Sequence, residues 1–305
     1  MEIWALYAIG ASFLWSLVNI SDQYLVSRYS TGRHTSGALV LFSSLIGIVI
    51  ALPMLFLVDG LWSIPLHDIA LLFIAGAMSA LWIILYLYSM EIEDVSVVVP
   101  WFLTVPVFGY ILGFLFLGEE LSFLQQVGSL VVLLGLAILS FDFSKAAKTK
   151  LKTEVMLYMF CACVLIALQG IIFKHVTVIE SFWISSFWEY VGLGLAGVFL
   201  YVCVPQYRRE FMTMLRHGGK QIFTLNMTSE IVSVAGNLLS TFALLLAPVT
   251  IVYLLTSFQP AFVLLFSVLG TLFIPNIIKE DISLRVLVPK IFAIAIMIAG
   301  SVFLF

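Results

Sequence analysis

Two glutamates of this sequence lie deep inside hydrophobic stretches. Glu189 interrupts the apolar segment SFWISSFWEYVGLGLAGVFLYVCV (181–204), and Glu230 lies within the segment 221–246. If both segments are helices, Glu189 lies about 10 Å from the start of its helix and Glu230 about 14 Å from the start of the other. A charged side chain at such a depth in a membrane is costly unless it faces protein or water. We therefore interpret both glutamates as lining a cavity, where they contact substrate or exchange protons. The alternative is a permanently protonated carboxyl group with a packing role.

Other polar and aromatic side chains share helical faces with these acids. Glu230 begins a polar stripe with a spacing of three to four residues, and hydroxyl groups precede Glu189 at the same spacing. Interhelical hydrogen bonding is the simpler explanation for any single hydroxyl. The candidate substrate-binding residues are Trp15, Asn19, Trp82, Tyr86, Trp101, Glu189, Glu230, Asn237, Tyr253 and Thr256.

The elements that must position these residues are membrane-spanning helices. Hydrophobic residues make up 63% of the 305 residues, charged residues make up 10%, and the mean hydropathy is +1.17. Apolar runs of about 20 residues, the length that crosses a bilayer, recur along the whole chain. The sequence predicts an integral membrane protein of the cytoplasmic (inner) membrane. The ten predicted helices are 4–25, 38–58, 69–90, 95–117, 122–141, 154–173, 182–204, 221–246, 249–274 and 285–305.

Several kinds of chemistry have no support in the sequence. It contains no glycine-rich phosphate loop, no His/Cys ligand cluster and no basic stripe for nucleic acid. The three cysteines fall inside predicted helices, where small apolar packing is their simplest role. The four histidines are scattered over predicted helix ends and loops. We therefore expect no cofactor, no metal site, no nucleic-acid partner and no enzymatic activity.

An internal repeat indicates how the helices are organised. The segment VSVVVPWFLTVP (95–106) aligns without gaps on VTIVYLLTSFQP (249–260). If the repeated unit has five helices, the second copy must enter the membrane from the opposite side, as in many secondary transporters. The predicted fold is all-α, with ten transmembrane helices in two inverted five-helix repeats. The repeats are 1–142 and 154–305, and 143–153 is a basic linker.

Two stretches of the sequence resemble a known family. FLGEELSFLQQVGSLVVLLGLAIL (116–139) and ASFLWSLVNI (11–20) are similar to the EamA-like ten-helix branch of the drug/metabolite transporter (DMT) superfamily, although Ser16 stands where glycine is usual. The resemblance extends over essentially the whole chain. It implies five plus five helices, alternating access, transport of small metabolites or drugs, and both termini in the cytoplasm.

Prolines and charged residues outside the candidate site lead to further expectations. Pro100, Pro106 and Pro260 remove backbone donors inside predicted helices, so they are candidate hinges or static kinks. Glu119 and Glu120 fall at a helix boundary, where we expect water to solvate them.

Basic residues predict the orientation in the membrane. Of the 14 Lys and Arg residues, all but Lys174 fall on one side of the predicted bundle. Because positive side chains favour the cytoplasm, this bias places both termini outside it, contrary to the family resemblance.

These features together favour a secondary transporter. We expect alternating access, possible coupling to protons through Glu189 or Glu230, and a small-molecule substrate such as an amino acid or a related compound. The only other expected partner is the lipid bilayer, and the sequence leaves the oligomeric state open. The alternative is a lipid-handling protein, either a scramblase or a lipid-modifying enzyme.

Overall fold

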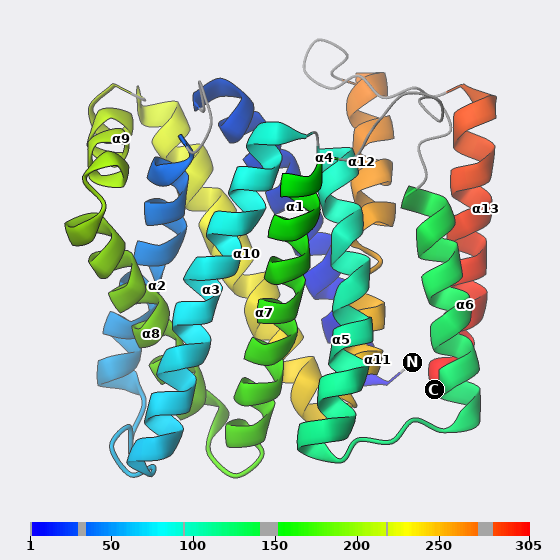
Figure 1. The fold of residues 1–305 in the computed structure, drawn as a ribbon, viewed down its shortest axis with the longest axis horizontal. Helices are drawn as coiled ribbons and strands as arrows, with labels where there is room; N and C mark the ends of the chain where they lie inside the picture. Colours follow the sequence, from blue (N-terminus) through cyan, green and yellow to red (C-terminus); the bar gives the residue numbers. More distant parts are fainter. Residues whose placement is uncertain (1, 30–34, 94, 141–151, 218, 274–282) are drawn as a thin grey trace.

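The computed structural model describes residues 2–29, 35–93, 95–140, 152–217, 219–273 and 283–305. In these residues the chain forms a bundle of helices that run across it from one face to the other (Figure 1). The long helices are α1 (Ile3–Tyr29), α2 (Gly37–Leu57), α3 (Leu66–Ile92), α6 (Phe123–Ser140), α7 (Thr153–Thr177), α8 (Phe182–Cys203), α10 (Gly219–Leu246) and α13 (Leu284–Ser301). Of the predicted basic linker 143–153, only Lys152 and Thr153 belong to the described residues.

The described part of the chain contains nine stretches that are long and apolar enough to cross a membrane, and a shorter apolar helix at Phe123–Leu139. These ten stretches correspond to the ten predicted helices, so the all-α membrane fold is confirmed. The segment between the seventh and eighth predicted helices forms a further helix, α9 (Pro205–His217), which is not among the membrane-crossing stretches of the described residues. Both ends of the chain lie on the same face, which we call the terminal face (Figure 1).

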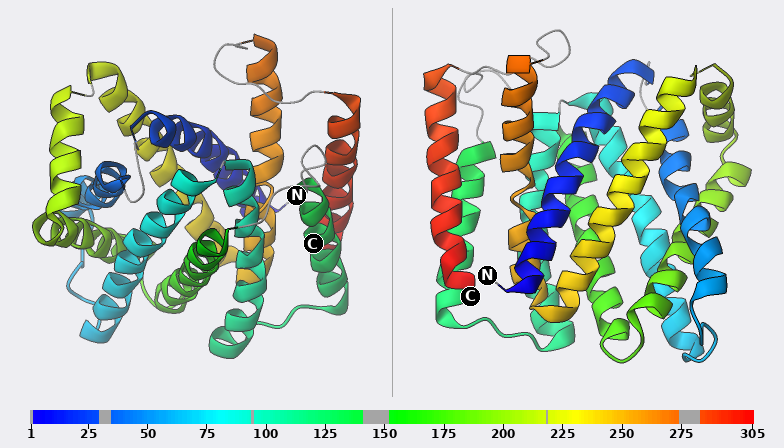
Figure 2. Two further views of the ribbon diagram at one scale, coloured as in Figure 1. Left: turned by 45° about the horizontal axis from the view of Figure 1, so that its top comes forward. Right: turned by 180° about the vertical axis from the view of Figure 1, so that it is seen from behind.

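Helices distant in the sequence pack side by side in this bundle. Helix α1 packs along α10, α3 packs between α7 and α8, and α2 packs on α8. Helices α6 and α13 pair with each other at one edge of the molecule (Figures 1 and 2). The helices around the candidate site therefore come from both halves of the sequence.

Glycines allow the closest of these contacts. A Cβ atom added to Gly76 of α3 would lie 2.0 Å from the backbone oxygen of Glu189 in α8. One added to Gly192 of α8 would lie 2.3 Å from the backbone oxygen of Phe73. Small residues are used in this way wherever membrane helices approach closely. The α3–α8 contact holds the backbone of Glu189 firmly against a neighbouring helix.

Two of the membrane segments are interrupted. The fourth consists of α4 (Val95–Val98), the 3₁₀ helix η1 (Val99–Thr104), α5 (Val105–Leu112) and the π-helical turn η2 (Gly113–Leu117). The ninth consists of α11 (Val249–Thr256) and α12 (Gln259–Phe273). The three prolines lie at these interruptions: Pro100 in η1, and Pro106 and Pro260 in the first turns of α5 and α12. In the first turn of a helix a missing backbone N–H costs little.

Candidate substrate cavity

A cavity of about 200 Å³ lies between the helices of the bundle. Helices α1, α2, α3, α7, α8, α10 and α11 line it, together with η1 and the first turns of α5 and α12. An apolar cavity of 150 Å³ binds a benzene ring, so this volume suits a small molecule. Its wall combines aromatic, amide, hydroxyl and carboxyl groups, which can orient a polar ligand.

Nine of the ten candidate substrate-binding residues line this cavity. They are Trp15, Asn19, Trp82, Tyr86, Glu189, Glu230, Asn237, Tyr253 and Thr256. Trp101 is not among the lining residues; its side chain packs against hydrophobic clusters, and its backbone oxygen accepts a hydrogen bond from the thiol of Cys163. Of the prolines, Pro260 lines the cavity, whereas Pro100 and Pro106 are absent from its wall among the described residues.

Glu189 is held by a chain of hydrogen bonds that crosses three helices. The side chain of Glu189 is buried, and its Oε1 accepts a hydrogen bond of 2.8 Å from Nε2 of Gln169 in α7. Oε1 of Gln169 accepts a hydrogen bond of 3.1 Å from the indole nitrogen of Trp82 in α3. The indole nitrogen can only donate, so it fixes the orientation of the Gln169 amide and directs its NH₂ group at Glu189.

Glu230 is also buried and has a neutral partner. The hydroxyl of Ser43 in α2 donates to its Oε1. Asp22 of α1 lies near enough to interact electrostatically with Glu230. The hydroxyl of Tyr86 contacts Oδ1 of Asn19 at 3.0 Å and Oδ2 of Asp22 at 3.3 Å. Three carboxyl groups therefore line one cavity, and each contacts an uncharged polar side chain.

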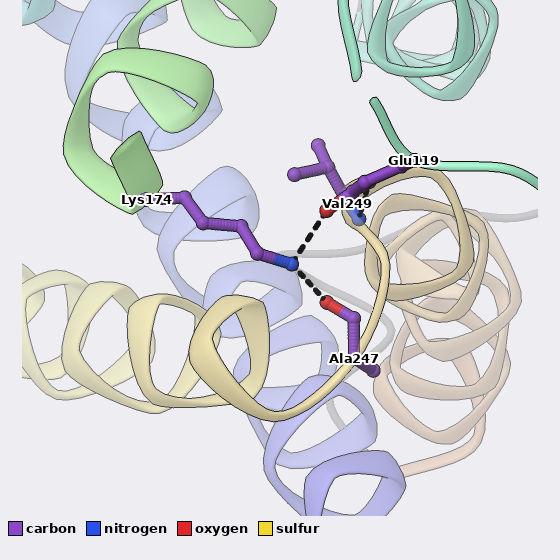
Figure 3. Close-up of polar contacts among 4 residues, drawn as sticks. All are labelled: Glu119, Lys174, Ala247 and Val249. Carbon is purple, nitrogen blue, oxygen red and sulfur yellow. Dashed lines mark hydrogen bonds and ion pairs between the residues drawn. The ribbon is translucent and has the colours of Figure 1, made fainter. Parts of the chain in front are cut away.

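A largely buried ion pair joins Lys174, near the end of α7, to Glu119, beside the junction between α10 and α11 (Figure 3). Nζ of Lys174 lies 2.6 Å from Oε1 of Glu119 and donates a hydrogen bond of 2.6 Å to the backbone oxygen of Ala247. Oε2 of Glu119 accepts a hydrogen bond of 2.8 Å from the backbone nitrogen of Val249. The side chains of Lys174 and Glu119 are only 12% and 14% exposed, so the expectation that Glu119 is solvated was wrong. We call these contacts the Glu119–Lys174 latch.

The latch ties three parts of the chain together below the cavity. Phe173 and Leu244 line the cavity, and they lie one residue before Lys174 and three residues before Ala247. The backbone groups of Ala247 and Val249 flank Pro248, where α10 ends and α11 begins. Glu119 comes from the connection between η2 and α6, in the first half of the sequence. The latch therefore joins the two halves of the chain at the terminal face.

A second, more exposed lysine contact is found at the other end of α7. Nζ of Lys152 donates a hydrogen bond of 2.9 Å to the backbone oxygen of Ile92 and lies 3.2 Å from Oε1 of Glu93. The Lys152 side chain is 53% exposed. In the alignment of the two repeated segments, the α3–α4 junction corresponds to the α10–α11 junction. Each end of α7 thus places a lysine on the carboxyl end of a helix, where a positive charge is favourable.

Sequence reasoning missed part of the cavity wall. Asp22, Ser43, Gln169 and Gln259 line it but were not among the candidates. The residues three and four positions away from Gln169 along its helix are all apolar, so no polar stripe indicates that Gln169 lines a cavity. Ser43 gains its importance only from the contact with Glu230, which joins residues 187 positions apart in the sequence.

Comparisons with known proteins agree with this architecture. Residues 2–141 match the model of the EamA-like transporter family. A protein of known crystal structure has a similar fold over 98% of this chain and 95% of its own, with a TM-score of 0.66 and 12% sequence identity. At that identity the likeness describes the fold alone. No curated protein sequence matches the chain.

The segment 2–141 of this membrane protein therefore belongs to the EamA-like transporter family, within the DMT superfamily, as the sequence resemblance predicted. This is a family of transporters rather than of enzymes.

Proposed function

We propose that this protein is a secondary transporter that moves a small metabolite, such as an amino acid or a related compound, across the membrane through the central cavity. The observation that carries the proposal is the cavity itself. It is enclosed by helices from both halves of the chain and lined by three carboxyl groups in an otherwise apolar bundle. Intramembrane acids facing an internal cavity are typical of substrate and ion pathways.

The transport cycle is alternating access by two inverted five-helix repeats, 1–142 and 154–305. The repeated sequence segments support this organisation, and so do the interruptions in both the fourth and the ninth membrane segments. Helix α1 starts at the terminal face and α7 starts at the opposite face, as an inverted repeat requires (Figure 1). Pro100, Pro106 and Pro260 act as hinges at these interruptions.

The Glu119–Lys174 latch closes the cavity on the terminal face in this conformation. It joins both halves and fixes the α10–α11 junction, so that face can open only when the ion pair and its two backbone hydrogen bonds break. The Lys152–Glu93 contact at the opposite face is formed in the same conformation, so we assign it no part in closing the cavity.

Glu189 and Glu230 are the proton-coupling groups. The titratable groups near Glu189 are the hydroxyls of Tyr190 and Tyr253, and the group near Glu230 is Asp22. A carboxyl group that alternates between two sides of a membrane can carry a proton with it or exchange that proton for substrate. Neutral hydrogen-bond partners such as Gln169 and Ser43 can serve either protonation state.

The distribution of basic residues supports an orientation with both termini outside the cytoplasm. Among the basic residues with described side chains, Lys152 precedes α7, Arg208, Arg209 and Arg216 belong to α9, Lys220 lies at the start of α10, and Lys290 lies in the second turn of α13. Helices α7, α10 and α13 begin at the face opposite the termini, and α9 lies towards that face (Figure 1). Lys174 lies at the terminal face and is held by Glu119. The proposed location is the cytoplasmic (inner) membrane.

Lipid handling is the alternative function. The carboxyl, amide and hydroxyl groups of the cavity wall favour a small polar substrate over the acyl chains of a lipid. No specific contact of the described residues supports the lipid alternative.

A thermal-shift screen of the purified protein tests the proposed function. Amino acids, sugars, nucleobases and aromatic metabolites are compared at pH 6 and pH 8, because a ligand that binds the folded state raises the melting temperature. The proposal predicts saturable stabilisation by one class, which is lost or becomes independent of pH in Glu189→Gln or Glu230→Gln. Stabilisation by lipids alone would overturn it in favour of lipid handling.

A further inference from the structure

The charged groups of the cavity all have the same sign. Asp22, Glu189 and Glu230 line it, and no Lys, Arg or His from the described part of the chain does so. Lys174 is adjacent to the lining residue Phe173, but its ammonium group is already bound to Glu119 and to the backbone oxygen of Ala247. The cavity wall therefore contains no built-in counter-ion for its three acids.

The hydrogen bonds of these acids leave room for a ligand. Gln169, Ser43 and Tyr86 each make one hydrogen bond to an acid, and all three are uncharged. Each carboxylate has two oxygens and about four acceptor sites, so most of this capacity is unused. A buried acid in this condition is stabilised by a cation or loses its charge.

Asn19 provides an independent sign of a ligand. Its side chain lines the cavity and is only 4% exposed, and its Nδ2 has no hydrogen-bond partner. Buried polar groups are nearly always hydrogen-bonded, so an exception in the wall of a cavity calls for a missing partner. The position of Asn19 is fixed by the contact between its Oδ1 and the hydroxyl of Tyr86. Nδ2 is a donor, and its partner would be an acceptor atom such as a hydroxyl or carbonyl oxygen.

Aromatic rings from three helices also line the cavity. They are Trp15 of α1, Trp82 and Tyr86 of α3, and Tyr253 of α11. Ring faces attract ammonium groups and also pack against apolar bodies. The volume of about 200 Å³ accommodates one ring or a short aliphatic chain.

We propose that this cavity selects a protonated amine attached to a small aromatic or aliphatic body. The ammonium group lies between the carboxyl groups and the aromatic rings, and a hydroxyl or carbonyl oxygen of the substrate accepts from Asn19. A free carboxylate on the substrate is disfavoured because it would face three acids without a basic partner. This inference rests on the proposed function and narrows its substrate class, from amino acids and related compounds to amines that lack a free carboxylate.

Three ligands that share a phenyl ring and differ in charge test the proposal. Phenethylamine is a cation, phenylalanine is a zwitterion and phenylacetate is an anion, and 2-phenylethanol serves as the neutral reference. Binding to the full-length purified protein is measured by calorimetry and by the fluorescence of the cavity tryptophans. We expect phenethylamine to bind at least tenfold more tightly than phenylalanine, and phenylacetate not to bind. Glu189→Gln, Glu230→Gln and Asp22→Asn should each be measured, and at least one should weaken amine binding tenfold while 2-phenylethanol is unaffected.

Variants are compared only after their melting temperatures show that they fold, and Glu120→Gln, an exposed acid outside the cavity, is the matched control. The inference is overturned if phenylacetate or phenylalanine binds more tightly than the amine, if none of the three acid variants alters amine binding, or if no amine of an aromatic and aliphatic series binds. Tight binding of the amine without flux into vesicles would leave this inference standing and contradict the transport function. Flux of an anion into vesicles would support the transport function and contradict this inference.

Discussion

The Glu119–Lys174 latch gives the most specific prediction about the closed terminal face. Opening this face breaks one ion pair, the bond from Lys174 to the oxygen of Ala247 and the bond from Val249 to Glu119. A hydrogen bond to a charged group contributes about 1.5–3 kcal/mol, whereas an exposed ion pair contributes about 0–1 kcal/mol. Because both side chains are less than one-sixth exposed, we expect Lys174→Met to lose about 2 kcal/mol. This corresponds to a roughly thirtyfold shift towards the open state.

Cysteine labelling from the terminal face measures this shift. Ser240 lines the cavity, so Ser240→Cys is introduced after Cys161, Cys163 and Cys203 have been replaced. The rate of reaction with a membrane-impermeant maleimide reports how often the terminal face opens. Lys174→Met and Glu119→Gln should each raise this rate by roughly one order of magnitude or more, following from the shift estimated above.

Matched variants distinguish the latch from a general effect of charge. Glu120→Gln makes the same change one residue away, at an exposed side chain, and should leave the labelling rate unaltered. The double variant Glu119→Gln/Lys174→Met should label about as fast as the faster single variant, because the two residues act through one contact. The reasoning would be refuted if Lys174→Met and Glu119→Gln labelled no faster than Glu120→Gln.

Three further predictions concern packing, hydrogen bonding and orientation. A Cβ on Gly170 would lie 1.8 Å from the hydroxyl of Tyr253, so Gly170→Ala should destabilise the protein by about 1–3 kcal/mol in denaturation, and adding Tyr253→Phe should restore most of the loss. Failure of the second change to restore stability would mean that the overlap lies elsewhere. Trp82→Phe removes the donor to Gln169 and should cost about 1–3 kcal/mol of stability, and an unaltered melting temperature would contradict the Trp82–Gln169–Glu189 chain. A tag on either terminus should be accessible to antibody outside intact cells, and an inaccessible tag would reverse the proposed orientation.

The sequence was sufficient to predict the membrane helices because their signal is local. A run of about 20 apolar residues satisfies its backbone hydrogen bonds in a bilayer only as a helix. The observed helices lie within a few residues of the expected positions. Helix α9 was missed because its charged sequence, PQYRREFMTMLRH, lacks the apolar length on which that signal depends. The prolines indicated interruptions, but the 3₁₀ and π-helical geometry of the fourth segment depends on tertiary packing.

The cavity was only partly predictable for the same reason. Glu189 and Glu230 stood out because an acid in an apolar run is costly, whatever surrounds it. The partners Gln169 and Ser43 are ordinary polar residues, and only the packing of helices distant in sequence brings them to the acids. Glu119 looked like a solvated residue at a helix boundary because the position of Lys174, 55 residues further along the sequence, could not be inferred from spacing.

Substrate exchange through reconstituted vesicles tests the central claim most directly. The protein is placed in liposomes loaded with unlabelled ligand, and uptake of the same labelled ligand, chosen from the binding screens, is followed over time. The account predicts uptake that saturates with ligand concentration, requires ligand on the opposite side and falls at least tenfold in Glu189→Gln or Glu230→Gln, while Glu120→Gln matches the unmodified protein. Uptake that rises linearly with concentration, or that is equal in all four proteins, would contradict a transport site in this cavity.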